Sequence, residues 1–383
     1  MTLLRRCAVL FIEIREDLDL DLRALFSGVG ALGATLRQIA LAPHVGDEIE
    51  LGDAELTLLG ALGPTLWQER SQCEQRFGPE LVERLLELGL LIGTESAYSA
   101  MRERDDALRA AYWRPLSAVA HAFSRWHDIK GENGKRFPTF DSLVASFGPP
   151  PPATIECAPE HACVDLPAPL DGPLDATLLG RYTGRNFDAQ AVLPLPVAAR
   201  LLQRTFGAQH QRQISPEATV LKKTSPSGGG LHPIEAYVLV QRVSGIAPGL
   251  YHYHPLRHRL EPMQLLGSEA ARTLALATVA DQQWFADAPM LVVMAGRVER
   301  SFWKYRDHPK SYRVLLLDAG HLSQTFYLLA AEAGLPAFIT AGINEVNIEH
   351  AFGLDPLKHA VIAVCGCGTA TAQASMTELR PAR

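Results

Sequence analysis

Hydrophobic residues in the second half of the chain form several long, nearly unbroken runs. Residues 289–298 and 360–364 are apolar at most positions, which is typical of strands that are buried on both faces. Residues 234–243 are rich in β-forming residues and predict a third strand. The segments 250–254 and 259–262 predict the two arms of a hairpin. These runs indicate a sheet in this half of the chain.

Two helices are expected beside these strands. Residues 197–206 follow prolines that suit the first turn of a helix. Residues 312–333 predict a longer helix whose apolar side chains go nearly all the way round. Such a helix has to be buried on most of its faces, and an interface between two copies of the chain is a natural way to bury it.

The first part of the chain is expected to be a smaller, mainly helical unit. Its predicted elements are a strand at 8–14, an apolar segment at 55–62 before a Gly-Pro turn, a helix at 80–89, a strand at 90–92 and a helix at 107–126. A helix that ends on a glycine and leads into a short apolar strand resembles part of a winged-helix domain. Both a purely structural role and a peptide- or partner-binding role stay open for this region.

Prolines separate the two halves. Residues 147–174 contain the consecutive prolines 149–152 and four more beyond them. Because proline fixes φ and removes a backbone donor, regular structure is not expected here. We therefore predict an N-terminal region at 1–146, a linker at 147–174 and a C-terminal domain at 175–375.

Composition narrows the classes of function. The 383-residue chain is 47% hydrophobic and carries a net charge of −6, which argues against nucleic-acid binding through a general basic surface. The six cysteines are too sparse for a disulfide framework, and Cys157, His161 and Cys163 lack the spacing of a zinc site, as do Cys365 and Cys367. We expect no metal, no signal peptide, no membrane span and a cytoplasmic location.

Two segments carry candidate ligand-binding groups. Arg181 and Arg185 bracket Thr183, and two guanidinium groups beside a hydroxyl suit a phosphate, although a solvated basic turn would have the same pattern. Further on, Ser227 precedes three consecutive glycines that lead into the strand at 234–243. Glycines let a backbone approach a flat ligand closely, and a tight, ordered crossing explains them better than a flexible loop.

Two further segments carry candidate reactive or partner-seeking groups. Lys304 and Tyr305 stand side by side among aromatic residues, and burial there would lower the pKa of the lysine toward the range of a base. Composition alone favours a surface lysine with its stem over the aromatic rings. On the long apolar helix, His321 and Gln324 need polar partners, and His321 is assigned no chemical role.

Taken in order, these motifs resemble the flavin-dependent nitroreductase superfamily, and more narrowly its SagB-type azoline dehydrogenases, over about 175–369. The shared features are Arg181-x-Thr183-x-Arg185, Pro226–Gly229 before a strand, Gly249–Tyr253, Lys304–Tyr305, Gly320-His321-x-x-Gln324 and Gly334–Leu335. The resemblance implies an α+β nitroreductase-like fold, with an antiparallel or mixed sheet flanked by helices. It also implies a homodimer that binds FMN, and a precursor peptide whose thiazoline or oxazoline rings are oxidised beside a cyclodehydratase.

The same resemblance assigns roles to individual residues. Arg181, Thr183 and Arg185 would hold the FMN phosphate. Lys304 and Tyr305 would be the catalytic pair. The flavin site would be lined by Pro226, Ser227, Gly228, Gly229, Gln324, Ala341 and Gly342. The chain departs from the family pattern at Tyr182, where an arginine is common, and at Thr183, where serine is usual. It also has Thr340-Ala341-Gly342 in place of a double glycine, and lacks a basic residue close after Cys367.

Other activities fit the same motifs. An NAD(P)H-dependent nitro or quinone reductase, or a dehydrogenase acting on a Cα–Cβ bond, would use the same fold and cofactor. A non-catalytic scaffold subunit of a peptide-modifying complex is a rival of a different class. The arginines together with Lys304–Tyr305 argue against the scaffold, and flavin content would discriminate the two.

Overall fold

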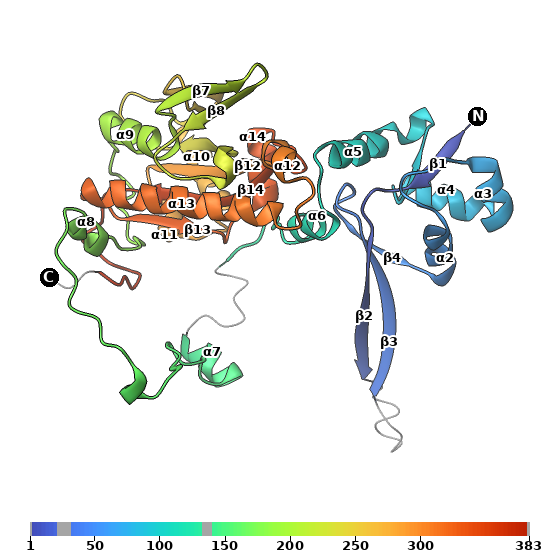
Figure 1. Cartoon of the computed structure of the whole chain (residues 1–383), viewed down its shortest axis with the longest axis horizontal. Helices are drawn as coiled ribbons and strands as arrows, with labels where there is room; N and C mark the ends of the chain where they lie inside the picture. The colour runs from blue at the N-terminus through green and yellow to red at the C-terminus, as the bar shows by residue number, and fades with distance from the viewer. Residues whose placement is uncertain (1, 21–31, 132–139, 381–383) are drawn as a thin grey trace.

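The computed structural model describes residues 2–20, 32–131 and 140–380, and its largest element is a six-stranded sheet (Figure 1). The strand order is β11-β10-β9-β12-β14-β13, with antiparallel pairing throughout. The strands are β9 (Ile234–Val240), β10 (Gly249–His254), β11 (Arg259–Leu265), β12 (Met290–Arg297), β13 (Ala337–Thr340) and β14 (His359–Cys367). The strands predicted from the apolar runs and the predicted hairpin are confirmed; β13 was not predicted.

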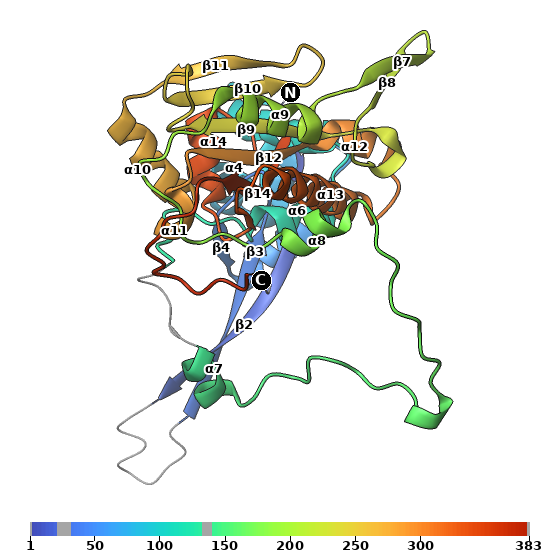
Figure 2. The ribbon, with the colours of Figure 1, turned by 90° about the vertical axis from the view of Figure 1, so that its left-hand side faces the viewer.

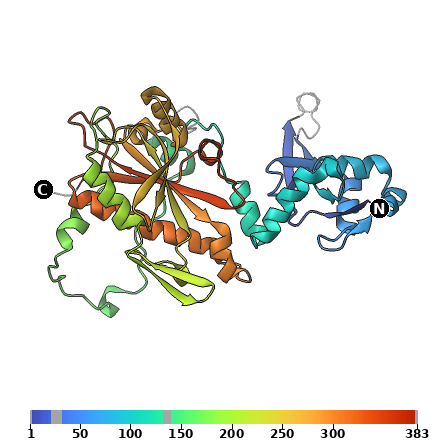
Figure 3. The same ribbon diagram turned by 90° about the horizontal axis from the view of Figure 1, so that it is seen from above.

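Helices cover both faces of this sheet. One face carries α9 (Leu195–Phe206) and α13 (Ser311–Glu332), and the other carries α10 (Ser268–Thr278), α11 (Gln283–Ala286) and α14 (Glu345–Phe352). The central strand β12 shows why its sequence is apolar throughout: Met290, Val292 and Met294 face the first layer, and the intervening residues face the second. Figure 3 shows the strands fanning between these layers.

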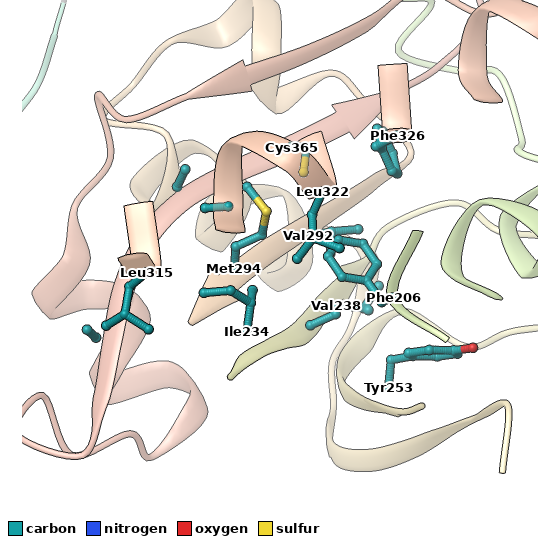
Figure 4. Close-up of a cluster of buried hydrophobic side chains, with 14 of the residues drawn as sticks. Phe206, Ile234, Val238, Tyr253, Val292, Met294, Leu315, Leu322, Phe326 and Cys365 are labelled. Atoms are coloured by element: carbon teal, nitrogen blue, oxygen red, sulfur yellow. The ribbon is translucent and has the colours of Figure 1, made fainter. Parts of the chain in front are cut away.

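The core beneath α13 holds the candidate site in place. Figure 4 shows Leu315, Leu322 and Phe326 of α13 packed over β9, β12 and β14, with Phe206 of α9 beside them. All four side chains are buried. By length and composition α13 could cross a membrane, but these contacts make it a core helix of the domain. Burial of each of these side chains contributes about 1.5–3 kcal/mol to the stability of the fold, so α13 is held firmly on the sheet.

The N-terminal region forms a separate small core. One sheet pairs β1 (Leu3–Arg6) with β5 (Gln68–Glu69) and β6 (Leu91–Gly93), and a second contains β2 (Phe11–Leu20), β3 (Leu32–Leu41) and β4 (Glu48–Leu51). The helices are α2 (Asp53–Ala61), α3 (Arg70–Phe77) and α4 (Pro79–Glu87), with a short η1 (Ser96–Tyr98). The predicted helix at 80–89 and strand at 90–92 are confirmed. The predicted strand at 8–14 is displaced, because the chain turns at 7–10 between β1 and β2.

The helix predicted at 107–126 is wrong as a single element. The chain forms α5 (Ser99–Ala110) and α6 (Pro115–Ala122), and Tyr112 between them has φ 58°. Pro115 starts α6 because proline suits the first turn of a helix and disfavours its interior. The break lets Trp113 donate its indole N–H to the carbonyl of Leu357 at 2.8 Å, which anchors α5 and α6 to the larger domain.

The segment between α6 and α9 is mostly irregular. It contains α7 (Phe140–Phe147), the short η2 (Glu160–Ala162) and α8 (Asp175–Gly180), and Figure 2 shows its proline-rich part extending away from the body. Beyond α9, the hairpin β7 (His210–Ser215) and β8 (Ala218–Lys222) projects from the domain before η3 (Gly228–Gly230). The last helix near the site is α12 (Val298–Tyr305), which runs directly out of β12.

Candidate active site

The segment that carries Arg181 and Thr183 packs against the C-terminal part of α13. Thr183 forms a parallel bridge with Ala337 of β13, and its hydroxyl lies 3.0 Å from the hydroxyl of Tyr327. Tyr327 also accepts the N–H of Ile339 at 3.2 Å. The Arg181 guanidinium lies 5.2 Å from the centroid of the Tyr327 ring. Tyr327, which sequence reasoning did not single out, therefore organises this group.

The C-terminal tail returns to the same segment. Glu378 accepts the backbone N–H of Arg185 at 2.5 Å, and Asn186 accepts the backbone N–H groups of Ser375 and Met376 at 2.7 and 2.8 Å. Arg380 pairs with Glu378 at 2.7 Å and lies 5.4 Å from the centroid of the Tyr182 ring. The tail thus places the guanidinium of Arg380 against Tyr182, within the segment that carries the predicted phosphate ligands.

The glycine-rich loop is ordered by a buried carboxylate. Asp318 of α13 is 2% exposed, accepts the hydroxyl of Ser227 at 2.5 Å and accepts the backbone N–H of Gly228 at 3.0 Å. Ser227 in turn accepts the N–H of His232 at 2.9 Å. The expectation of a tight, ordered loop agrees with this geometry. Because the Ser227 hydroxyl is committed inside the protein, its role here is to shape the loop.

Glycine is required where the loop meets α12 and α13. Gly229 has φ 63°, and a Cβ placed on it would come within 2.7 Å of the Tyr305 hydroxyl and 2.8 Å of the Lys304 ammonium. A Cβ on Gly228 would collide with Val314. The loop therefore brings its backbone directly against the two candidate catalytic side chains.

Lys304 lies at the open side of this arrangement. Its ammonium is 3.5 Å from the carbonyl oxygen of Gly229 and 5.9 Å from the centroid of the Tyr305 ring. The side chain is exposed, which agrees with the surface lysine that composition favours over burial among aromatic residues. Phe302 turns into the core, while Trp303 and Lys304 face outward on α12. Phe302, and not Lys304, therefore makes the buried aromatic contacts of this segment.

The remaining predicted residues lie on α13 and after β13. Gln324 and His321 are exposed, together with Leu316 and Leu317 at 45% and 63%. The prediction that this helix is buried on most faces is therefore wrong for the single chain: one face packs on the sheet and the opposite face is open. Ala341 and Gly342 follow β13, and the Gly342 carbonyl accepts the Gln282 side-chain amide at 2.6 Å.

The structure places these groups in two clusters at opposite ends of α13. The glycine loop, Lys304 and Tyr305 lie near Val314 and Asp318, whereas Arg181 and Thr183 lie near Tyr327. Val314 and Tyr327 are thirteen residues apart, so about 20 Å of helix separates the clusters. One chain does not bring all the predicted residues into one place.

Two buried charges beneath the loop were missed from the sequence. Besides Asp318, Lys223 is 3% exposed, and burial lowers the pKa of its ammonium to about 8. A cavity of about 10 Å³ between them is also lined by Ser227 and His232. The signal for Asp318 was its position as a carboxylate on an otherwise apolar helix, where it requires a partner.

A larger groove of about 770 Å³ opens beside Lys304. Its lining includes Gly229 and Trp303, residues of the β7–β8 hairpin, and Tyr112 from the break between α5 and α6. This volume lies within the usual range of about 300–1,000 Å³ for ligand pockets. The candidate reactive group therefore faces a space that can hold a substrate.

Known proteins share this architecture. The Nitroreductase family profile matches residues 178–369, half of the 383-residue chain. The chain is 34% identical over 144 residues to the trifolitoxin-processing protein TfxB of Rhizobium leguminosarum bv. trifolii, covering 37% of this chain and 38% of TfxB. It is 27% identical over 187 residues to the microcin B17-processing protein McbC of Escherichia coli, covering 48% of this chain and 64% of McbC.

A solved structure of the E. coli microcin synthetase McbBCD complex, with truncated pro-MccB17 bound, contains a chain that superposes with a TM-score of 0.47 and 21% identity. The superposition covers 70% of this chain and 97% of that chain. The sequence alignments span less than two thirds of either processing protein. The family match itself includes the six-stranded sheet, the glycine loop, Lys304–Tyr305 and α13, so the expected fold is confirmed and the chain belongs to the nitroreductase family.

Proposed function

We propose that this protein is an FMN-dependent dehydrogenase that oxidises azoline rings to azoles in a ribosomally made precursor peptide. The observation that carries the proposal is the convergence of Lys304, Tyr305 and Gly229 at the edge of an open groove. The peptide-processing names of TfxB and McbC support a peptide as the substrate. The family match supports an oxidoreductase.

The residues present fit FMN. Arg181 and Arg185 offer guanidinium donors for a phosphate, because Glu378 pairs with Arg380 and with a backbone N–H instead of with their side chains. Gly228 and Gly229 leave no room for a Cβ, so the loop presents bare backbone to a flat ring. Gln324, Ala341 and Gly342 would contribute to the flavin site. Thr183 can donate its hydroxyl to the phosphate while Tyr327 holds it.

A homodimer would complete this site. The phosphate cluster (Arg181 and Thr183) and the loop cluster (the glycine loop, Lys304 and Tyr305) lie about 20 Å apart on one chain. The face of α13 between them exposes Leu316, Leu317 and Gln324. Packing this face against its equivalent in an antiparallel copy brings the loop cluster of one protomer toward the phosphate cluster of the other. Leu317→Glu should therefore produce a monomer in sedimentation and also lose FMN.

The chain's own residues divide the chemistry. Lys304 is the group proposed to take the proton from the ring carbon at Nζ, while the Gly229 carbonyl orients that nitrogen. Tyr305 positions the amine or relays the proton to solvent from its hydroxyl beside Gly229. FMN, when bound, supplies the acceptor for the second hydrogen and both electrons. Asp318 keeps the loop backbone rigid throughout.

The N-terminal region is proposed to bind the precursor peptide or a partner such as a cyclodehydratase, in a cytoplasmic complex. This rests on its separate core and on its attachment beside the groove through Tyr112 and Trp113.

The test begins with the absorbance spectrum of the purified protein and the identity of the released cofactor. Flavin bands and free FMN, followed by oxidation of an azoline peptide, are the expected result. Lys304→Ala should abolish turnover while FMN stays bound; retained turnover would exclude Lys304 as the base. Sustained NADPH consumption with nitro or quinone acceptors would favour a reductase. Oxidation of a Cα–Cβ bond would favour a dehydrogenase that acts on that bond. A colourless protein that takes up no FMN would favour a scaffold subunit.

A further inference from the structure

The groove beside Lys304 has walls from three parts of the chain that are far apart in sequence. Tyr112 comes from the end of the N-terminal region, Ala218–Val220 from the β7–β8 hairpin, and Trp303 from α12. Most of its lining is apolar. Lys304 and Gly229 also line it, so anything bound there would lie against the proposed reactive group.

Two large aromatic side chains stand open in this groove. Trp303 is 57% exposed and Tyr112 is 42% exposed. The Arg306 guanidinium lies 4.2 Å from the centroid of the Tyr112 ring and braces it. Flat aromatic surfaces of this kind favour a planar ring as ligand, with a gain of about 0.5–1.5 kcal/mol for each stacked or edge-on pair.

The backbone at Tyr112 strengthens this assignment. Its φ of 58° lies in the left-handed region, which costs a residue with a Cβ about 1–2 kcal/mol. Glycine would avoid that cost at a turn between two helices, so the tyrosine side chain needs a reason of its own. Strained positions of this type are concentrated at ligand sites.

One wall also offers an open strand edge. Within the described residues β8 pairs only with β7, and Ala218, Thr219 and Val220 of β8 line the groove. An extended peptide can add to such an edge through its backbone, while its side chains fill the adjoining pocket. Lys304 lines the same groove, so a peptide on this edge would lie close to the proposed reactive group.

We propose that this groove binds an extended segment of the substrate peptide along β8, with its five-membered ring held against Trp303 and Tyr112. The identity of the ring rests on the function proposed above, whereas peptide binding itself does not. Trp303 and Tyr112 are then specificity-determining residues, since they select a planar ring over the open side chain from which it was made.

The test uses the full chain loaded with FMN and two synthetic peptides, one containing a thiazole and one with cysteine in its place. Binding is measured by titration calorimetry, and turnover with the matching thiazoline peptide. Trp303→Ala and Tyr112→Gly should each weaken thiazole-peptide binding about fivefold, within the range expected for one aromatic pair, and raise KM more than they lower kcat. Tyr112→Gly also relieves the backbone, so loss of binding there is not a loss of folding.

Matched variants separate the possible outcomes. Trp303→Phe and Tyr112→Phe should keep binding within about twofold because they retain a ring. Leu265→Ala, an apolar side chain removed at a 64% exposed site on β11 outside the groove lining, should change nothing. Equal binding of the two peptides, or unchanged binding by the Ala and Gly variants, would overturn the proposal. Absence of FMN or of turnover in the wild type, with ring-selective peptide binding intact, would instead overturn the proposed reaction alone.

Discussion

Asp318, buried on α13, accepts the hydroxyl of Ser227 at 2.5 Å and thereby fixes the loop that faces Lys304. The same carboxylate accepts the backbone N–H of Gly228. The long apolar helix α13 thus carries a buried carboxyl group whose two oxygens both hold the glycine loop. The loop conformation is therefore fixed by contacts on its buried side, while Gly229 lines the open groove on the other side.

Asp318→Asn should loosen this loop. The amide keeps one acceptor and turns the other oxygen into a donor, which faces either the Ser227 hydroxyl or the Gly228 N–H. A buried group left unsatisfied costs about 1–3 kcal/mol. We expect a loss of that size in the free energy of unfolding in urea, together with weaker FMN binding. Ser227→Ala, which removes one hydrogen bond and leaves the Gly228 contact, should show a smaller loss; equal binding of FMN by all three proteins would contradict the assignment.

Gly229 and Gly230 form a matched pair that separates strain from steric displacement. Both have left-handed φ, 63° and 68°, so alanine at either should cost about 1–2 kcal/mol of stability. Only at Gly229 would the new Cβ reach Lys304 and Tyr305; at Gly230 nothing lies within 4 Å. Because a displacement of about 1 Å can cost about 100-fold in rate, Gly229→Ala should lose most of kcat and Gly230→Ala little. Similar kcat values for the two variants would show that these side chains do not act at this position.

Most strands of the larger domain can be predicted from the sequence because they are buried on both faces. Runs such as those around Val292 and Val364 have no polar face, which is typical of strands covered on both sides. The hairpins β2–β3 and β7–β8 lack this signal: β7 is exposed at every position, and no alternation marks it. Turn geometry and tertiary context decide such segments, and neither is visible in a hydrophobic pattern.

The site was only partly predictable for a related reason. Motif residues such as Lys304 and Gly229 were identified, but their separation from Arg181 along α13 depends on how the helix runs across the sheet. The tail contact of Glu378 with Arg185 joins residues 193 positions apart, and no local pattern indicates it. The face of α13 that carries Leu317 is exposed although burial is predicted for it, because apolar composition alone does not distinguish the core of a domain from an interface between two chains.

Acid should weaken the anchor between α6 and the larger domain. His121 is 3% exposed between the Tyr312 hydroxyl and the Pro356 carbonyl, each at 3.2 Å, and burial lowers its pKa from 6.5 to about 4. The unfolded chain therefore binds a proton more readily, so this contribution to stability is complete above pH 6.5 and is lost as the pH falls toward 4. The full loss is on the order of 3 kcal/mol.

Urea unfolding at pH 7.5 and pH 5.0 measures this dependence. His121→Gln retains a donor and an acceptor but does not titrate, so its stability should fall less between the two pH values than that of the wild type. His44, which is buried, and His359, which is half-buried, also have lowered pKa values and are present in both proteins. The difference between the two proteins therefore isolates His121, and identical pH dependence would mean that its burial does not oppose protonation.

Arg380 should contribute to cofactor binding through the phosphate alone. Its guanidinium is held over Tyr182 by Glu378, beside the proposed phosphate ligands Arg181 and Arg185, and its side chain is 47% exposed. An exposed charge of this kind contributes little to binding, so Arg380→Gln should weaken FMN binding by no more than about fivefold. Riboflavin, which has the same ring without the phosphate, should bind both proteins equally. Arg257→Gln makes the same charge change at an exposed site in the β10–β11 turn and should leave FMN affinity unchanged. Parallel weakening of riboflavin would mean that the tail acts on the fold of the site and not on the phosphate.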